Sequence, residues 1–568
     1  MRLTRIRIDK FRAIRAADIR VGKETALVGQ NSAGKTSILR ALNCFLNFDQ
    51  EREAFEKGQH SFTKSAFAII DITFSEVPSA CGLQRSSTAG DEVRARLRYR
   101  KTPQWQIYDG REWNSAPADF HEEIRNFITY AFIPLRRDHL IAGWGPDGLM
   151  ERVVEASVNA SRQRDHITPG IQKLTERIQK QSLSGLAKQL RKSTPLRGPF
   201  EFVLDYETSP DYSILLKNLI LHVREGNQTV SLADSGSGTQ SMAVFALYSY
   251  LAEIENSTYI LGFEEPEQNL HPQAQIQLLK SLTLLGLQVI FTTHSPTMID
   301  ALDHEQVVLC RRIKSATRDI ETRVTQLPTD FFPARGLNRD DYYRFHRRRN
   351  SEFFFADYVV VTESPIDAAV VSQLVSDAGM SPATANMSML SLDGVTNLDY
   401  VFHLLRALDI ASAFVVDKDY FLPYLHDDRA LSCDARGYPK FKRSIKSSTV
   451  VDFMFPKAAD RAKLEAALFE RHSAATEMLS KVGFFCFRWS MEVDLVATAT
   501  TRQNLFRVCN VQVGDQTEQE LLVSRYKMIK KQDVLLRAVG GVDARSLPAS
   551  FKALRRSLFE VASELTAP

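Results

Sequence analysis

The sequence predicts an α/β protein in which parallel strands are divided between two successive domains. Two local patterns indicate this class: short apolar runs that end in glycine-rich or acidic turns, and amphipathic helical segments that follow those turns. The length is a third observation, because 568 residues are too many for one hydrophobic core and favour about two to four domains.

The composition is that of a globular protein without a membrane-spanning segment. Hydrophobic residues make up 44% of the chain and charged residues 25%, and no apolar run approaches the roughly 18 residues that cross a bilayer. The opening segment, "MRLTRIRIDKFRAI", alternates charged and apolar residues and lacks the apolar core of a secretory signal. The 6 cysteines show no C-x-x-C spacing, which is typical of free thiols in a reducing compartment. We therefore expect a cytoplasmic protein that has no membrane partner.

A glycine-rich loop separates a strand from a helix in residues 24–42, "ETALVGQNSAGKTSILRAL". Its pattern, Gly-x-x-x-x-Gly-Lys-Thr between a strand and a helix, is specific for a phosphate-binding loop. Backbone amides of the loop and the helix N-terminus would surround phosphate oxygens, Lys35 would reach the β- and γ-phosphates, and Thr36 would hold Mg²⁺. The predicted ATP-binding residues of this loop are Gly29, Asn31, Gly34, Lys35, Thr36 and Ser37.

Two later strands end in residues suited to the chemistry of ATP. Residues 258–275, "TYILGFEEPEQNLHPQAQ", form an apolar strand that ends in Glu264 and Glu265. The first carboxylate is placed to bind Mg²⁺, and the second can orient the attacking water. Residues 287–300, "LQVIFTTHSPTMID", form another apolar strand, and His294 at its end could sense a γ-phosphate.

A fourth motif places a serine- and glycine-rich turn at the start of a helix in "SLADSGSGTQSMAVFAL", which gives a second anion-binding N-terminus. Its predicted ATP-contacting residues are Ser235, Gly236 and Gly238. Together the four motifs resemble the ATPase head of the ABC, SMC and RecF group. The resemblance implies a homodimer or larger homo-oligomer formed through the heads, because in that group the Ser-Gly element docks on the partner's ATP. Most of the group has Asp where this chain has Glu264, so ATP binding is expected and the efficiency of hydrolysis is open.

A helical insertion interrupts the predicted head. Residues 146–222 show helical apolar spacing that is broken at Pro169 and Gly170, which predicts two or more helices. In this architecture we expect the insertion to pair with a second copy of the chain. The predicted domains are a first part of the head over 1–145, the insertion over 146–222, a second part of the head over 223–340, and a further domain over 350–568.

The last domain repeats strands and helices in a way that predicts a small parallel sheet. Apolar strands at 358–362, 387–392 and 413–416 are separated by helical segments, and ligand groups gather at the carboxyl ends of such strands. The first strand ends at Glu363, with Asp367 on the next turn, and the third is followed by two aspartates one residue apart. The predicted metal ligands are Glu363, Asp367, Asp417 and Asp419.

A group of carboxylates this close needs a counter-charge. Residues i and i+2 of an extended chain point to the same side, so Asp417 and Asp419 face one point in space. Burial would raise the pKa of each unpaired carboxylate, and a bound divalent cation would remove that cost. Ligands that are all oxygen suit Mg²⁺ or Mn²⁺.

A strand-end Glu363 followed by the Asp417-x-Asp419 pair resembles the Toprim fold that topoisomerases, primases and some nucleases share, with Ser364 in place of the usual glycine. An ABC-type head with a helical insertion, followed by a Toprim domain with a C-terminal helical region, is the domain order of the OLD (overcoming lysogenization defect) family, which includes the Gabija antiphage nuclease subunit. The resemblance covers nearly the whole chain. It implies an ATP-binding, metal-dependent endonuclease of double-stranded phage or plasmid DNA, often in antiphage defence and in some cases with a second defence protein.

The resemblance also implies a later acid and a lysine in the nuclease site. The segment "FFCFRWSMEVDLVA" offers Glu492, with Asp494 as its rival, and "SRYKMIKKQDVLL" offers Lys527 ahead of Lys530 and Lys531. A lysine here would neutralise charge that develops on the phosphodiester. The implied chemistry is hydrolysis assisted by two metal ions about 4 Å apart. Flanking basic residues could contact the DNA backbone: Arg347, Arg348, Arg349, Lys440, Lys442, Arg443 and Lys446.

Other functions remain open from the sequence. An ATP-driven DNA-sensing clamp or scaffold with an inactive Toprim site would depend on a partner effector. A topoisomerase would need a catalytic tyrosine, and Tyr420 lies beside the acids, yet no segment is large enough for a DNA gate. A primase would need a template-binding module, for which the chain has no candidate segment.

Overall fold

The computed structural model describes the chain except for residues 64–65, 84–90, 137–147, 161–163, 179–220, 226–227, 256, 285–286, 315–319, 348–350, 393, 395–396 and 567–568. The chain forms two compact units. The N-terminal unit comprises Met1–Met298 and Cys310–Val324, and the C-terminal unit comprises Ile299–Leu309 and Thr325–Pro568. Among the described residues, no helix is long and apolar enough to cross a membrane.

The main sheet has 12 strands in the order β7-β6-β5-β4-β1-β2-β14-β13-β3-β12-β11-β8. Its bounds are β1 Arg2–Phe11, β2 Ile14–Arg20, β3 Glu24–Val28, β4 Ala68–Ser75, β5 Val93–Tyr99, β6 Pro103–Tyr108, β7 Trp113–Ser115, β8 Ile128–Ile133, β11 Thr258–Glu264, β12 Gln288–Thr293, β13 Val307–Ile313 and β14 Glu321–Gln326. Strands β4 and β5 alternate buried and part-exposed positions and pair antiparallel. Strands β3 and β12 are buried throughout and pair in parallel. The two burial patterns are those of a sheet covered on one face and on both faces, respectively.

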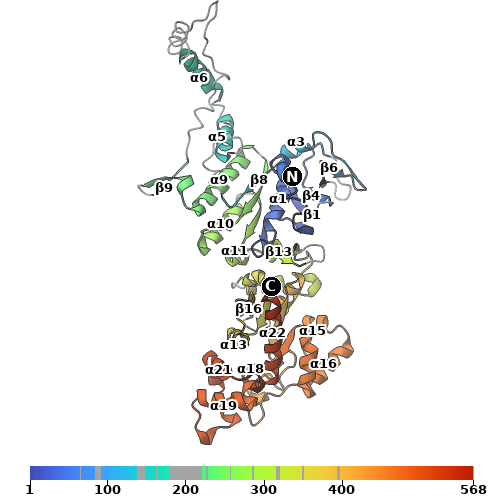
Figure 1. The fold of residues 1–568 in the computed structure, drawn as a ribbon, viewed down its shortest axis with the longest axis vertical. Helices are drawn as coiled ribbons and strands as arrows, with labels where there is room; N and C mark the ends of the chain where they lie inside the picture. The colour runs from blue at the N-terminus through green and yellow to red at the C-terminus, as the bar shows by residue number, and fades with distance from the viewer. Residues whose placement is uncertain are drawn as a thin grey trace, which may run out of the picture. The chain divides into compact units, whose positions relative to one another are not determined.

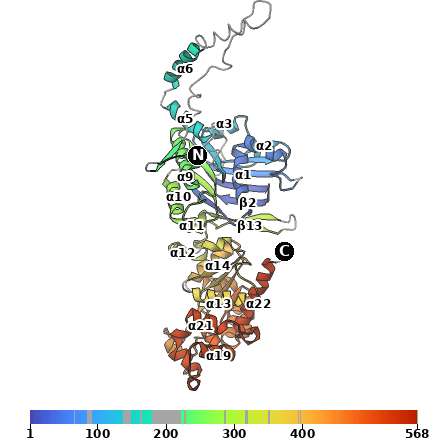
Figure 2. The ribbon, with the colours of Figure 1, turned by 60° about the vertical axis from the view of Figure 1, so that its left-hand side comes forward.

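Helices cover the parallel part of this sheet, and α1 and α9 pack against β11 (Figure 1, Figure 2). The helices of the N-terminal unit are α1 Lys35–Leu46, α2 Phe48–Glu56, α3 Phe120–Arg125, α5 Leu149–Ala160, α6 Arg164–Ile178, α9 Ser237–Glu255, α10 Pro272–Leu284 and the start of α11 Pro296–Asp300. A separate pair of strands, β9 His222–Glu225 and β10 Gln228–Ser231, precedes α9.

The helical insertion is only partly within the described residues. Its described helices are α5 and α6, and residues 146–147, 161–163 and 179–220 of the predicted insertion lie outside them. Helix α6 continues through Pro169 and Gly170, so the predicted break at this pair is wrong. A proline inside a helix removes one backbone hydrogen bond and its ring clashes with the carbonyl of residue i−4, which is a cost that helix α6 tolerates.

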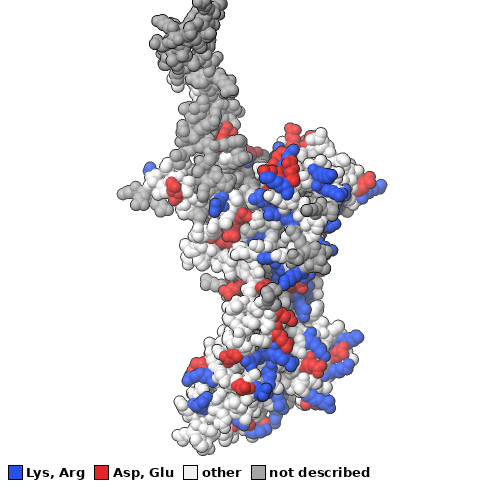
Figure 3. Space-filling view, in the orientation of Figure 1, with Lys and Arg blue, Asp and Glu red and all other residues white. Residues whose placement is uncertain are grey.

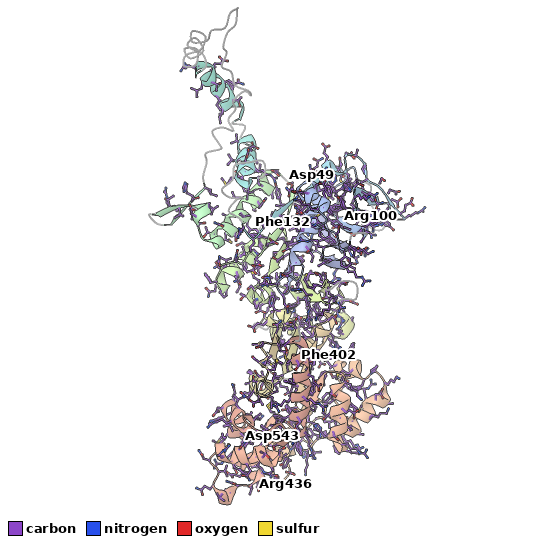
Figure 4. The ribbon with its side chains drawn as sticks, in the orientation of Figure 1. Asp49, Arg100, Phe132, Phe402, Arg436 and Asp543 are labelled. Carbon is purple, nitrogen blue, oxygen red and sulfur yellow. The ribbon has the colours of Figure 1, made fainter. Side chains whose placement is uncertain are left out.

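The C-terminal unit is built on a sheet of 4 parallel strands in the order β16-β15-β17-β18. The strands are β15 Tyr358–Thr362, β16 Met387–Ser391, β17 Ser412–Val416 and β18 Phe484–Cys486. Helices α13 Pro365–Ser376 and α14 Leu398–Ala407 connect the first three strands. Phe402 of α14 packs against Phe414 and Phe484 on two of these strands (Figure 4). The predicted α/β fold class, with a Toprim-like parallel sheet followed by helices, is confirmed.

Helices follow and flank this sheet. They are α12 Arg339–His346, α15 Thr449–Met454, α16 Ala458–Glu470, α17 His472–Ser480, α18 Met491–Ala497, α19 Ala499–Val508, α20 Tyr526–Ile529, α21 Gln532–Val539 and α22 Ala549–Thr566. Buried residues of α13, α18, α19, α21 and α22 form one hydrophobic core with β15 and β17. This core fixes the carboxyl edge of the sheet, where the predicted metal ligands lie.

Candidate functional site

The turn between β3 and α1 contains two glycines with positive φ values, a conformation that other residues rarely adopt. Gly29 and Gly34 adopt φ values of 143° and 94°. A Cβ atom would lie 2.0 Å from a carbonyl oxygen of β13 at Gly29 and 2.4 Å from a threonine hydroxyl of β14 at Gly34. Lys35 is only 6% exposed, and its Nζ donates to the carbonyl oxygens of Gly29 and Gln30 at 2.9 Å. Burial lowers the pKa of this amine.

The end of β11 brings a carboxylate to the hydroxyl of the loop. Thr36 Oγ1 donates to Glu264 Oε1 at 2.5 Å, and the Leu135 amide donates to Glu264 Oε2 at 3.3 Å. The longer side chain of glutamate, compared with aspartate, still reaches the threonine. A hydroxyl and a carboxylate are oxygen ligands of the kind Mg²⁺ takes beside phosphates, so these residues fit the predicted ion.

The predicted residues Glu265 and His294 also lie close together. Glu265 has a positive φ of 42°, and its carboxylate lies 3.6 Å from His294 Nε2. The Glu265 amide donates to the carbonyl and hydroxyl oxygens of Thr292, which ties the turn after β11 to β12. Burial, and then the charge of Lys35, lower the pKa of His294. A neutral imidazole and a carboxylate therefore face each other across the strand ends.

Three residues of this site were missed from the sequence. Glu267 is buried, and its Oε1 accepts hydrogen bonds from the Thr293 hydroxyl at 2.6 Å and from the His294 amide at 3.0 Å. It therefore fixes the end of β12. Arg12 and Gln59 line the cavity of about 580 Å³ that also contains the phosphate-binding loop, Glu264, Glu265 and His294. No nucleotide motif includes these two positions.

The Ser-Gly turn lies outside the residues that line this cavity. Ser235, Gly236 and Gly238 stand at the start of α9. A Cβ atom on Gly238 would lie 2.3 Å from Leu270 Cδ2, so the glycine permits close packing there. Gln240 Nε2 donates to the Ala233 and Ser235 carbonyl oxygens at 2.9 and 3.2 Å and stabilises the turn.

The acids of the C-terminal unit converge because their strands are neighbours. β15 and β17 pair in parallel with Thr362 opposite Val415, so the chain leaves both strands at one edge. The Asp417 amide donates to Glu363 Oε1 at 2.9 Å. Ligand oxygens of Glu363, Asp417 and Asp419 all lie within 4.8 Å of one another. These three residues are called the acidic cluster below.

The electrostatics of the acidic cluster favour a bound cation. Burial, opposed by the Asp417 amide and reinforced by the charges of Asp419 and other acids, raises the pKa of Glu363 to about 7. Burial also raises the pKa of Asp417, where the charge of Glu363 adds to the effect, and the pKa of Asp419. Three carboxylates with raised pKa values and no nitrogen or sulfur donor form a ligand set that fits Mg²⁺ or Mn²⁺.

Ser364 explains how the chain forms this turn without the usual glycine. Its φ of −137° is accessible to any residue, and it caps α13. The Ser364 hydroxyl and amide donate to Asp367 Oδ2 at 2.9 and 3.0 Å, while the Asp367 amide donates to the Ser364 hydroxyl. One oxygen of Asp367 is therefore used by the helix cap. Burial, and then the charge of Glu492, raise the pKa of this carboxyl.

Glu492 and a lysine complete the surroundings of the acidic cluster. The Met491 amide at the start of α18 donates to Asp417 Oδ1 at 3.1 Å, which places Glu492 beside the aspartates. Glu492 is 5% exposed, and its Oε1 lies 3.3 Å from Lys530 Nζ and accepts a hydrogen bond from the Tyr526 hydroxyl. Burial raises the pKa of Glu492, but Lys530 and Tyr526 outweigh it, so the net shift is downward.

The sequence left open whether Glu492 or Asp494, and which of the lysines, belongs to the nuclease site. The contacts of these side chains distinguish the alternatives. The Asp494 carboxylate accepts hydrogen bonds from the Arg488 and Trp489 amides and from the Ser550 hydroxyl, so it stabilises the turn before α18. Burial raises its pKa to about 6. Among the described residues, Lys530 and not the favoured Lys527 is in ion-pair distance of Glu492. Of the flanking basic residues, Arg348 and Arg349 lie outside the described residues, and Arg443 pairs with Glu470.

Comparisons with known proteins agree with both sites. Residues 25–300 match a family described as an AAA domain, putative AbiEii toxin, Type IV TA system. Residues 354–419 match the TOPRIM domain of overcoming lysogenization defect protein-like sequences. The chain therefore combines an AAA-type ATPase domain with an OLD-like TOPRIM domain. The first match extends from β3 past His294, and the second includes the three residues of the acidic cluster and ends at Asp419.

Two relatives of the chain are named nucleases. The OLD nuclease of Thermus scotoductus is 26% identical over 457 residues, which is 73% of this chain and 82% of that protein. The Old nuclease of Escherichia phage P2 is 22% identical over 468 residues, which is 74% of this chain and 78% of that protein. Among solved structures, an Smc head bound to the C-terminal winged-helix domain of ScpA aligns with a TM-score of 0.39 and 14% identity, covering 58% of this chain and 98% of that one. The SMC head domain from Thermotoga maritima aligns with a TM-score of 0.30 and 16% identity, covering 58% and 100%.

Proposed function

We propose that this chain is an ATP-binding, divalent-metal-dependent DNA endonuclease. The observation that supports this most directly is the acidic cluster, in which three carboxylates lie within 4.8 Å of one another and burial raises their pKa values. Such a group is costly to hold charged without a cation, and a hard cation beside it is a site for phosphodiester hydrolysis. The names of the two relatives point to the same activity.

The residues around the acidic cluster have separate tasks in this proposal. When bound, Mg²⁺ or Mn²⁺ would supply Lewis-acid activation of the attacking water and of the leaving oxygen. Glu363, Asp417 and Asp419 hold the first ion, and Asp367 with Glu492 provide carboxylates for a second. Lys530 takes the role that the sequence analysis gave to Lys527: its ammonium stabilises negative charge that develops on the phosphate in the transition state.

ATP would act through the N-terminal unit. Lys35 and the loop amides bind the phosphates, Thr36 and Glu264 hold the accompanying Mg²⁺, and Glu265 orients water when hydrolysis occurs. Ser235, Gly236 and Gly238 contact the ATP of a second copy, so the heads of residues 1–145 and 223–340 form a homodimer or larger homo-oligomer. The insertion of residues 146–222 adds to that contact, and residues 350–568 cut the DNA. Antiphage defence, with or without a second defence protein, is the biological role we propose.

Incubation of the purified chain with supercoiled plasmid tests the proposed function. We expect nicked or linear products with Mg²⁺ or Mn²⁺ and none with EDTA. Asp417→Asn should abolish cleavage and leave ATP binding at the wild-type level, because the substituted residue is in the other unit. Glu477→Gln, which removes an exposed carboxylate paired with Lys481, is the matched control and should cut normally. Cleavage by Asp417→Asn would contradict the proposal, and binding of DNA and ATP without cleavage in any metal would favour a clamp.

A further inference from the structure

A positively charged groove lies on the last helix of the chain, apart from the acidic cluster. It has a volume of about 470 Å³ and is formed by α22, the turn before it and the residue after α13. Figure 3 shows lysine and arginine side chains gathered over the region of α22, and Asp543, which begins the turn before the helix, is labelled in Figure 4. Four cationic side chains line the groove together with Phe559 and two alanines: Arg545, Lys552, Arg555 and Arg556.

The spacing of these residues concentrates charge on one face of the helix. Positions 552, 555, 556 and 559 follow the i, i+3, i+4, i+7 pattern that places side chains on a single face. Like charges at these spacings repel one another and destabilise a helix. Within the described chain, Arg556 approaches Glu560 at 3.8 Å, whereas Arg545 and Lys552 have no ion pair. An anion in the groove would remove this repulsion.

Within the groove, the guanidinium of Arg555 has one bonded nitrogen and one buried nitrogen without a hydrogen-bond partner among the described residues. Its Nη2 donates to the Asp377 carbonyl oxygen at 2.7 Å, which anchors the guanidinium at the end of α13. Its Nε is buried and has no hydrogen-bond partner among the described residues. Buried donors in folded proteins are normally bonded, so an acceptor oxygen at this wall is expected. Phosphate oxygens suit a fixed guanidinium, because they accept charge-assisted hydrogen bonds in its plane.

The remaining wall is apolar. Phe559 is 38% exposed, and the two alanines, Ala378 and Ala544, leave space beside it. A groove that offers cations on one side and an aromatic ring on the other matches a ligand with phosphates and a flat ring. The volume is within the range of about 300–1,000 Å³ that is usual for small-molecule sites.

The groove is also too distant to belong to the acidic cluster. Helix α13 begins beside Glu363 and ends two residues before Ala378. Its 12 residues span about 18 Å at 1.5 Å per residue. We propose that this groove is a second nucleotide site, which binds a nucleoside polyphosphate independently of the ATP site of the N-terminal unit. The inference does not depend on nuclease activity.

Equilibrium dialysis of the full chain with radiolabelled ATP tests the inference through four proteins. The wild-type chain should bind about two nucleotides, and Lys35→Ala about one, because the groove remains. The exposed double variant Lys552→Gln/Arg556→Gln should also bind about one, and the combined triple variant none. A control, Lys463→Gln/Lys481→Gln, removes the same charge from exposed positions elsewhere in the C-terminal unit and should still bind about two.

A wild-type chain that binds one nucleotide, with all binding lost in Lys35→Ala, would overturn the inference. The same holds if the groove variant keeps the wild-type stoichiometry but loses affinity for duplex DNA, because the cations would then contact a nucleic-acid backbone. A further variant tests the aromatic wall: in a Lys35→Ala background, Phe559→Ala should weaken ATP binding about tenfold and leave pyrophosphate binding unchanged. Equal binding of ATP before and after this substitution would exclude a base on Phe559.

Discussion

The carboxylates of the N-terminal unit have partners within the protein, whereas those of the acidic cluster in the C-terminal unit mainly face one another. Glu264 accepts a hydrogen bond from Thr36, Glu265 faces His294, and Lys35 places a positive charge in the same cavity. In the acidic cluster, the hydrogen bonds to Glu363 and Asp417 come from backbone amides, which are neutral. Of the nearby lysines, Lys446 donates to the Asp419 backbone carbonyl oxygen, and Lys530 contacts Glu492.

The two sites therefore differ in how their charges are balanced before a metal ion or a phosphate binds. The N-terminal site is close to neutral by itself, so its preference for ATP depends on Lys35 and on loop geometry. The acidic cluster is held in place by the strand register. Lys446 and Lys530 offset part of its electrostatic cost at Asp419, and a proton or a metal ion relieves the rest. The two units should therefore respond differently to the loss of one charge, to pH and to chelation.

The largest expected effect is the loss of ATP binding at the N-terminal site in Lys35→Ala. The amine makes charge-assisted hydrogen bonds to phosphates, and two such bonds correspond to about a hundredfold in affinity. Mn²⁺ binding to the acidic cluster should stay within about twofold of wild type, because the two sites do not share residues. Titration calorimetry with ATP and Mn²⁺-binding measurements by electron paramagnetic resonance give both values. A parallel loss of Mn²⁺ affinity would show that the units are not electrostatically separate.

Two lysine variants test which lysine acts beside the acidic cluster. Lys530→Ala should lower the rate of plasmid nicking about a hundredfold, because a charge that stabilises the transition state is removed. Lys527→Ala is the matched control, and it should change the rate less than about threefold since no ion pair with the acids is lost. Initial rates at saturating Mn²⁺ measure both. The reverse order of effects would return the catalytic role to Lys527.

Chelation and pH together should reveal the cost of the acidic cluster. The pKa of Glu363 is raised from 4.5 to about 7, so between these values the folded state holds a proton that the unfolded state releases. The resulting contribution is fully present below pH 4.5 and is lost as the pH rises through 7, by an amount on the order of 3 kcal/mol. In EDTA, the thermal midpoint of the C-terminal unit should therefore fall from pH 5 to pH 8.

Added Mg²⁺ should reverse this trend, because the ion binds the deprotonated carboxylates of the folded state only. Glu363→Gln, which removes the titrating group, should flatten the pH dependence in EDTA. A midpoint that rises with pH in EDTA would mean that the carboxylates are already compensated within the protein. The N-terminal unit should show no comparable response to chelation when ATP is absent.

The sequence predicted the positions that depend on strands and left alternatives open where a single side-chain direction decides. Glu363 and Asp417 follow apolar runs, and parallel strands bring such ends to one edge, so their meeting could be foreseen. Glu492 and Asp494 are two positions apart on α18, about 200° around the helix, and only the contact of the Met491 amide with Asp417 determines which faces the acids. Likewise α20 has 4 residues, too few for any periodicity to indicate whether Lys527 or Lys530 points inward.

The smallest expected effect concerns Ser364, where the chain departs from the Toprim pattern. Its hydroxyl caps α13 and also donates to Asp367, so Ser364→Ala should destabilise the C-terminal unit by about 1 kcal/mol. Ser364→Gly restores the usual residue and should cost only a few tenths of a kcal/mol, because glycine is also a tolerated N-cap. Either change removes one of the two hydrogen bonds to Asp367 Oδ2 and keeps the bond from the amide of residue 364, so Mn²⁺ affinity should be equal to or higher than that of wild type in both variants. Lower Mn²⁺ affinity in Ser364→Gly would mean that the serine is needed to orient Asp367 toward the ions, and the helix cap would then be part of the metal site.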